Sequence, residues 1–162
     1  MADSILLIED DRTSRRNLAA FLRSTGYEVY EAEDGEIALS LLTSTQFDVV
    51  ISDLNLPGHI NGIDILDRLK RIPRKVGAIL ITGAGSEDVR RRATSLGADY
   101  MEKPIQLEAL NKTIQQRTRR DLGQSIDSGA LKRSGSGLQN CRAERLRIGG
   151  SSLPTFSQDV LR

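Results

Sequence analysis

The order of its hydrophobic segments constrains the fold of this 162-residue chain more than any other feature. Short apolar segments of strand length alternate five times with stretches whose apolar residues recur at helical spacing. Parallel neighbours in a sheet need a crossover helix, and these crossovers are right-handed. The alternation therefore predicts a doubly wound α/β fold, in which helices cover both faces of a five-stranded parallel sheet. The expected strands are 4–9, 27–32, 47–52, 77–82 and 99–103, and the expected helices are 12–25, 35–44, 62–71, 86–96 and 106–118.

The composition of individual segments supports this assignment. "VVIS" and "AILIT" are apolar without alternation, which is typical of strands buried on both faces. "DYMEK" is the weakest strand and is expected at an edge of the sheet. Gly26 and Gly97 follow helical stretches, where a left-handed residue often ends a helix. Ser86 can cap the helix that begins with Glu87 and Asp88.

The sequence changes in character near residue 120. Residues 1–120 carry the alternating pattern and are expected to form one domain. Residues 121–162 are rich in Gly and Ser, poor in aromatic residues and without sustained periodicity. This composition predicts a disordered or loosely docked tail without a core of its own. The single cysteine, Cys141, has no partner for a disulfide or a metal site and is interpreted as incidental.

Charge and hydropathy exclude several classes of protein. The formal net charge is +1 and the tail has no helix-turn-helix pattern, so no nucleic-acid contact is expected. The longest apolar segments are far shorter than the roughly 20 residues of a membrane span, and the N-terminus lacks a signal-peptide profile. We therefore expect a cytoplasmic protein that makes no contact with a membrane.

Polar residues stand at four of the expected strand ends, where open parallel sheets bind their ligands. They are Glu9, Asp10, Asp53, Thr82 and Lys103. A hard cation such as Mg²⁺ prefers a few carboxylate oxygens, an ammonium neutralises phosphoryl charge, and a hydroxyl donates to a phosphoryl oxygen. The set therefore predicts an Mg²⁺-dependent phosphoryl site with Asp53 as the nucleophile.

Each of these residues also has an ordinary structural interpretation. The acids 9–11 could cap the helix that follows, and Asp11 is expected to do so. Asp53 alone could be a turn residue, Thr82 a plain strand end, and Lys103 a solvated side chain. The phosphoryl-site hypothesis is favoured because four separate strand ends supply matching chemistry.

"ILLIEDD", "VVISDLNLPG", "AILIT" and "YMEKP" together resemble the signature of response-regulator receiver domains, the phosphoacceptor modules of two-component signalling. The resemblance covers about residues 4–118. It implies a flavodoxin-like sheet of strand order 2-1-3-4-5, the order that the chemotaxis receiver exemplifies. It also implies that a histidine kinase or histidine phosphotransfer protein, as in a phosphorelay, forms a 4-aspartylphosphate at Asp53.

The resemblance implies a ligand set for Mg²⁺. Asp10 and Asp53 would bind the metal directly, and Glu9 would act mainly through water. Asn55 would contribute its backbone carbonyl.

The resemblance also implies a switch. Thr82 and Lys103 would contact the phosphoryl group. As Thr82 moves toward the phosphoryl group, Tyr100 would change rotamer. Lys103–Pro104 would be a cis peptide, which proline permits. Asn55 and Ala84 would influence how fast the phosphoryl group is lost.

The segment "LPGHINGID" departs from the commonest family pattern, "MPxMDG", because it is one residue longer between Pro57 and Gly62. Contacts of this loop with a partner kinase are therefore expected to differ. His59, the only histidine, is expected to be a solvated loop residue, with a role in tuning the site as the alternative.

We therefore expect a phosphoacceptor switch, not an enzyme, that signals by protein contacts. Its output face would be helix 86–96, strand 99–103 and helix 106–118, and would include Arg90, Arg91 and Arg92 unless these form only a solvated helix face. A homodimer and the receiver part of a longer transcriptional regulator are open alternatives.

Two other functions fit less well. An Mg²⁺-dependent aspartyl phosphohydrolase would need a second acid where Asn55 stands, and an amide cannot serve as general acid. A flavin or nucleotide binder would need a glycine-rich loop where "EDDRTSR" is acidic.

Overall fold

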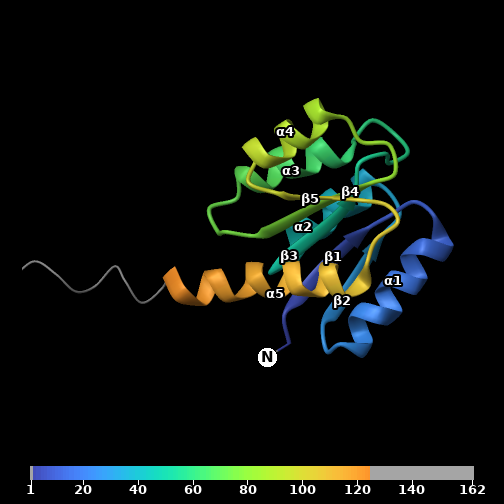
Figure 1. Cartoon of the computed structure of the whole chain (residues 1–162). Helices are drawn as coiled ribbons and strands as arrows, with labels where there is room; N and C mark the ends of the chain where they lie inside the picture. The colour runs from blue at the N-terminus through green and yellow to red at the C-terminus, as the bar shows by residue number, and fades with distance from the viewer. Residues whose placement is uncertain (1, 125–162) are drawn as a thin grey trace, which may run out of the picture. The chain divides into compact units, whose positions relative to one another are not determined.

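The computed structural model describes residues 2–124, with side chains up to residue 118, and this part of the chain has the predicted doubly wound α/β fold (Figure 1). All strand pairs are parallel, and the sheet order is β2-β1-β3-β4-β5, so β5 is an edge as expected. The elements are β1 (Ser4–Ile8), α1 (Arg12–Ser24), β2 (Glu28–Ala32), α2 (Gly35–Ser44), β3 (Val49–Asp53), α3 (Gly62–Lys70), β4 (Gly77–Thr82), α4 (Glu87–Ser95), β5 (Asp99–Glu102) and α5 (Leu107–Gln124).

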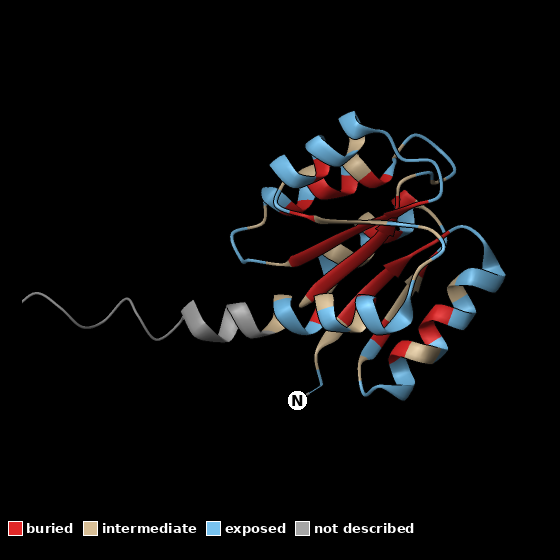
Figure 2. Cartoon of the chain, viewed as in Figure 1, coloured by how far each residue is buried: buried red, intermediate tan, exposed pale blue. Residues whose placement is uncertain are grey.

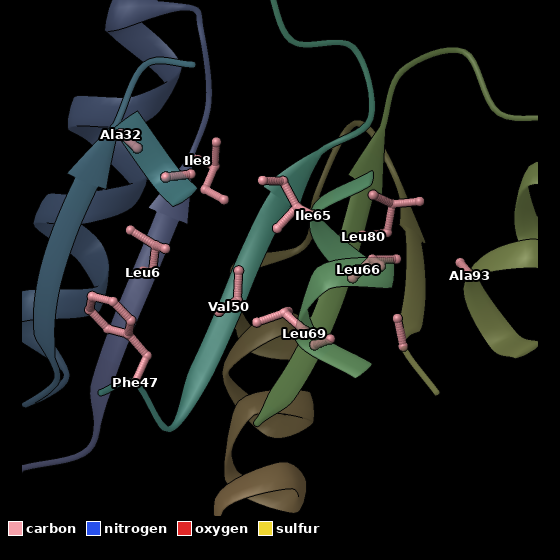
Figure 3. Packing of buried hydrophobic residues seen from close by; sticks show 13 residues of the cluster. Leu6, Ile8, Ala32, Phe47, Val50, Ile65, Leu66, Leu69, Leu80 and Ala93 are labelled. Atoms are coloured by element: carbon pink, nitrogen blue, oxygen red, sulfur yellow. The ribbon is translucent and has the colours of Figure 1, made fainter. Parts of the chain in front are cut away.

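Two hydrophobic cores lie on opposite faces of the sheet. Successive residues of a strand point to opposite faces, so each buried strand supplies both cores. Helices α1 and α5 cover one face, and α2, α3 and α4 cover the other (Figure 1). The central strands β3 and β4 are buried along their whole length (Figure 2). In the core between the sheet and helices α2, α3 and α4, three strand residues pack against Leu66 and Leu69 of α3 (Figure 3). They are Leu6 of β1, Val50 of β3 and Leu80 of β4.

The prediction that the apolar strands without alternation are buried on both faces is confirmed. Every residue of β3 and of β4 is buried, because helices cover both faces. β5 is only partly buried along its length, as its edge position requires.

Element ends differ slightly from the predicted ones. β3 begins at Val49 and continues through Asp53, which pairs with Ile81 of β4, so the candidate nucleophile is still part of the ladder. Helix α5 continues to Gln124, past the boundary expected at residue 120. The expected tail from residue 125 onward, with Cys141, lies outside the described residues.

Local signals mark several element ends as expected. The Asp11 side chain accepts a hydrogen bond of 2.7 Å from the Ser14 N–H and caps α1. This bond also lowers the pKa of Asp11. Ser86 caps α4 through the Val89 N–H, and Gly26 and Gly97 have φ of 99° and 85° after α1 and α4. Among the described helices, none has the length and hydrophobicity that crossing a bilayer requires.

Candidate functional site

Three acids meet at the carboxyl ends of β1 and β3. These strands are neighbours, with Ile8 paired to Ser52, so Glu9 and Asp10 after β1 lie beside Asp53 at the end of β3. One carboxylate oxygen from each acid lies within 4.8 Å of the other two. Glu9 and Asp53 are only 5% and 7% exposed, whereas Asp10 is exposed. Buried carboxylates at this spacing repel one another unless a cation lies between them.

Lys103 supplies such a cation. Its Nζ donates a 2.8 Å hydrogen bond to Oε2 of Glu9 and also forms an ion pair with Oδ2 of Asp53. The backbone N–H of Lys103 donates to the Thr82 carbonyl at 2.9 Å, which ties the start of the β5–α5 loop to β4. The next peptide bond, Lys103–Pro104, is cis, as the resemblance implies. One ammonium, just after the edge strand β5, therefore bridges Glu9, just after β1, and Asp53, at the end of β3.

Burial and the lysine act in opposite directions on the acids. Burial raises the pKa of Glu9 above its ordinary value of 4.5, while the hydrogen bond and charge of Lys103 oppose this and the charge of Asp53 adds to it. Burial alone would lower the pKa of Lys103, but its hydrogen bonds to Asp53 and Glu9 outweigh this, so the pKa is raised. The site therefore favours a charged lysine and resists additional negative charge unless another cation arrives.

Asp53 is held by the loop and helix that follow it. Its Oδ1 accepts a 3.1 Å hydrogen bond from the Asn55 N–H, so the turn after β3 orients the carboxylate. Helix α3 begins at Gly62, whose N–H donates to the Leu54 carbonyl at 2.9 Å. A Cβ at Gly62 would overlap the Asp53 carbonyl oxygen, so only glycine lets α3 start this close to the strand.

Thr82 lies at the end of β4, the strand next to β3, and is fully buried. Its Oγ1 accepts a 3.1 Å hydrogen bond from the Ala84 N–H. Both residues therefore belong to one turn that leads from β4 toward α4.

Tyr100 lies on β5 and reaches this same turn. Its hydroxyl donates a 3.1 Å hydrogen bond to Oε1 of Glu102 and occupies the space that a Cβ of Gly85 would need. Partial burial, followed by this hydrogen bond and the charge of Glu102, raises the pKa of the tyrosine. Tyr100 is therefore coupled to the turn after Thr82 by direct contact.

The loop after β3, which is one residue longer than in the commonest family pattern, packs against α2. Ile60 packs where a Cβ of Gly35 would stand, and Gly58, with φ of +91°, lies beside the carboxylate of Glu36. His59 is exposed at the tip of this loop, in agreement with the expected solvated position.

Arg15 of α1 also belongs to the site, although the sequence did not single it out. Its Nη1 donates to the backbone carbonyls of Glu9 at 2.6 Å and of Asp10 at 3.2 Å. In the sequence it stands between Arg12 and Arg16, and no local signal separates the three.

All the strand-end residues predicted from the sequence lie in the described part of the chain, and Glu9, Asp10, Asp53 and Lys103 form one cluster. A parallel sheet of order 2-1-3-4-5 with a polar site at its carboxyl edge defines an α/β domain of the flavodoxin-like class. The chain belongs, within that class, to the response regulator receiver domain family, whose sequence pattern it matches over residues 5–115.

Three comparisons illustrate this relationship. The chain is 30% identical to sporulation initiation phosphotransferase F of Bacillus subtilis over 70% of its own length and 92% of that protein. It is 28% identical to the cell cycle transcriptional regulator CtrA of Caulobacter vibrioides over 91% of its own length and 62% of that protein. A crystal structure of a response regulator receiver domain protein from Clostridium thermocellum matches with a TM-score of 0.71 and 31% identity over 75% of this chain and 98% of that one.

Receiver domains of two-component systems partner with histidine kinases or phosphotransfer proteins, and they generally bind Mg²⁺ at an acidic pocket. Many relatives carry the receiver as one part of a larger protein, and the chain spans less than two thirds of several curated relatives, CtrA among them.

Proposed function

We propose that this chain is a phosphoacceptor switch, in which a histidine kinase or histidine phosphotransfer protein donates a phosphoryl group to Asp53. The observation that carries the proposal is the single Lys103 ammonium shared by the buried carboxylates of Asp53 and Glu9. In the transfer, a P–O bond forms to an Asp53 carboxylate oxygen while the donor's P–N bond breaks, and the imidazole leaves with that electron pair. The 4-aspartylphosphate is then a stored signal, not an intermediate of turnover.

The donor set of the site fits Mg²⁺. Three carboxylates with oxygens within 4.8 Å of one another suit a hard cation that keeps several of its waters. Asp10, Asp53 and the backbone carbonyl of Asn55 would hold the metal, and Glu9 would assist through water. When bound there, Mg²⁺ would offset the repulsion between the anionic carboxylate and the anionic phosphoryl group.

Lys103 and Thr82 complete the phosphoryl site. When the phosphoryl group arrives, the Lys103 ammonium neutralises charge on its oxygens, and the Thr82 hydroxyl turns toward it to donate a hydrogen bond. The turn after β4 carries Ala84 and Gly85, so a movement of Thr82 reaches Tyr100. The resulting rearrangement of α4, β5 and α5 changes the surface that a downstream protein meets. Such a switch works only if the phosphoryl group binds one conformation better than the other.

Two ways of passing on the signal are proposed for the whole protein: through a further regulatory domain, or through direct contacts of the receiver alone. The coverage of CtrA favours the receiver part of a longer transcriptional regulator, and the coverage of sporulation initiation phosphotransferase F favours a receiver that acts alone. A cytoplasmic location stays a prediction from the sequence. An aspartyl phosphohydrolase is disfavoured because Asn55, whose amide cannot act as a general acid, stands two residues after Asp53.

The first test is phosphoryl labelling of Asp53. Wild-type protein incubated with acetyl phosphate and Mg²⁺ should acquire a hydroxylamine-sensitive phosphoryl group, seen as a shifted band on a phosphate-affinity gel. Asp53→Asn should lose this label altogether, because an amide oxygen is too weak a nucleophile. Removal of Mg²⁺ with EDTA should also abolish labelling.

Asp67→Asn on α3 is the matched control, since Asp67 pairs with Arg71 away from the acid cluster, and this variant should label like wild type. Equal labelling of wild type and Asp53→Asn would contradict the proposal. Steady turnover of a simple phosphate ester that Asp53→Asn abolishes would favour the hydrolase instead.

A further inference from the structure

In the described structure, Arg15 is the arginine of α1 whose side chain contacts the backbone of the acid-bearing loop. Its guanidinium donates to the carbonyls of both Glu9 and Asp10, the residues that begin the β1–α1 loop. Its other nitrogens face Glu31 at 3.7 Å and Glu33 at 3.4 Å, at and just after the end of β2. The Arg15 side chain is only 11% exposed. The arginine thus joins a helix, the acid-bearing loop and a neighbouring strand end.

The contacts to main-chain carbonyls matter because they fix the backbone from which the acid side chains project. The Glu9 N–H already donates to the Ala32 carbonyl at 3.1 Å, and Arg15 holds the carbonyl of the same residue. In the described sheet, the pairing of β1 with β2 and β3 ends at Ile8, so Asp10 lies beyond the strand ladder. Both carbonyl bonds come from Nη1, and the ion pairs of Nε and Nη2 with Glu31 and Glu33 fix the plane of the guanidinium and so the direction of Nη1. The compact ammonium of a lysine, on its flexible stem, cannot be oriented in this way.

We propose that Arg15 is a positioning residue that sets the divalent-cation affinity of the site by holding the Glu9 and Asp10 backbone in its binding geometry. This inference rests on the proposed Mg²⁺-dependent function of the same site. Groups that orient metal ligands without touching the metal commonly change metal affinity by about 10- to 100-fold when removed.

Electrostatics alone predicts the opposite sign for this residue. Arg15 is a cation near an acidic cation site, so its charge repels Mg²⁺, and removing that charge should tighten binding. Positioning predicts weaker binding when the fork is lost. The sign of the change in Mg²⁺ affinity therefore separates the two effects.

The test measures Mg²⁺ binding to the whole chain by isothermal titration calorimetry, without any phosphoryl donor. Arg15→Met keeps an apolar stem and removes the fork and the charge, whereas Arg15→Lys keeps the charge and removes the fork. We expect both to bind Mg²⁺ about tenfold more weakly than wild type. Arg16→Gln removes an exposed charge from the same helix and should bind Mg²⁺ as tightly as wild type, or slightly more tightly.

A second readout separates positioning from loss of stability. With acetyl phosphate, Arg15→Lys should need about tenfold more Mg²⁺ for half-maximal labelling and should reach the wild-type rate at saturating Mg²⁺. Circular dichroism without Mg²⁺ checks that the variants are folded, and Arg15→Lys decides the matter if Arg15→Met does not fold.

Mg²⁺ affinity of Arg15→Lys equal to that of wild type, or tighter affinity of a folded Arg15→Met, would overturn the inference. The proposed function fails separately, if wild type binds Mg²⁺ but is not labelled by any donor.

Discussion

At the scale of single residues, the site is a balance of charges centred on Lys103. Its ammonium pairs with two acids that are almost completely buried, and this is why its pKa is raised although burial acts to lower it. Glu9 experiences the reverse, because burial raises its pKa and the lysine restrains the increase. Without a metal ion, the folded protein therefore binds a proton on Glu9 more readily than the unfolded chain does.

The sign of the pH dependence follows from linkage. Because the pKa of Glu9 is raised on folding, ionised Glu9 costs stability, and this cost appears as pH rises from its ordinary value of 4.5 through the raised native value. The raised pKa of Lys103 acts at alkaline pH, where its stabilising contribution is lost as pH rises through the native value.

Lys103→Met should shift the pKa of Glu9 further upward, because the hydrogen bond and charge that lower it are removed while burial and Asp53 remain. The measurement is an NMR titration of the Glu9 side-chain carboxyl carbon in the presence of EDTA. Lys112→Met on the exposed face of α5 should leave the Glu9 titration unchanged. A Glu9 pKa that falls, or stays as in wild type, in Lys103→Met would show that the lysine does not control this acid.

At the scale of elements, the β4–α4 turn is where the site meets the edge of the sheet. Thr82 accepts the N–H of Ala84, and the next residue, Gly85, lies directly against the Tyr100 hydroxyl of β5. α4 begins just beyond, at Glu87 with Ser86 as its cap. We therefore expect a shift of this turn to move the start of α4 and the side chain of Tyr100 together.

Gly85→Ala should displace Tyr100, because the new Cβ would overlap its hydroxyl. The hydroxyl is the far end of a rotatable side chain, so we expect the fold to persist with a loss of about 1–3 kcal/mol in the free energy of unfolding. Part of this loss, about 1 kcal/mol, comes from the hydrogen bond to Glu102. NMR of the Tyr100 ring and chemical denaturation measure the two effects.

Gly83→Ala is the matched control in the same turn, since its new Cβ would meet nothing closer than Cδ of Lys103 at 3.9 Å. Its Tyr100 ring signals and stability should be those of wild type. Unchanged Tyr100 signals in Gly85→Ala would contradict the prediction, because the backbone of the turn would then have moved in place of the tyrosine side chain.

At the scale of the whole molecule, the fold brings the five strand ends to one edge and places all the described buried hydrophobic residues between Ile5 and Ile114. The described core that supports the site is therefore contained in residues 1–130.

A chain ending at Ala130 should unfold cooperatively within about 2 °C of the complete chain, because all the described core residues are retained. It should also take the acetyl phosphate label at the wild-type rate. Differential scanning calorimetry and the phosphate-affinity gel provide the measurements. A clear loss of melting temperature would assign residues 131–162 a part in stability that the composition of the sequence does not suggest.

Much of the fold could be predicted from the sequence because its signals are local. Apolar runs without alternation marked the buried strands, and Gly26, Ser86 and Gly97 marked helix ends through their own backbone and capping preferences. The candidate site could be predicted for the same reason. Once the strands were known, the residues that follow them, such as Asp53 and Lys103, had to gather at one edge of a parallel sheet.

The sequence by itself determined the class of fold and the set of residues at its carboxyl edge, because periodicity and strand ends are properties of neighbouring residues. Only the tertiary structure decided which groups touch. Lys103 meets Glu9 across 94 positions and Asp53 across 50, and Arg15, not Arg12 or Arg16, reaches the carbonyls after β1. These contacts depend on how helices and loops pack over the sheet, and side chains of the same type become different only when that packing buries one of them.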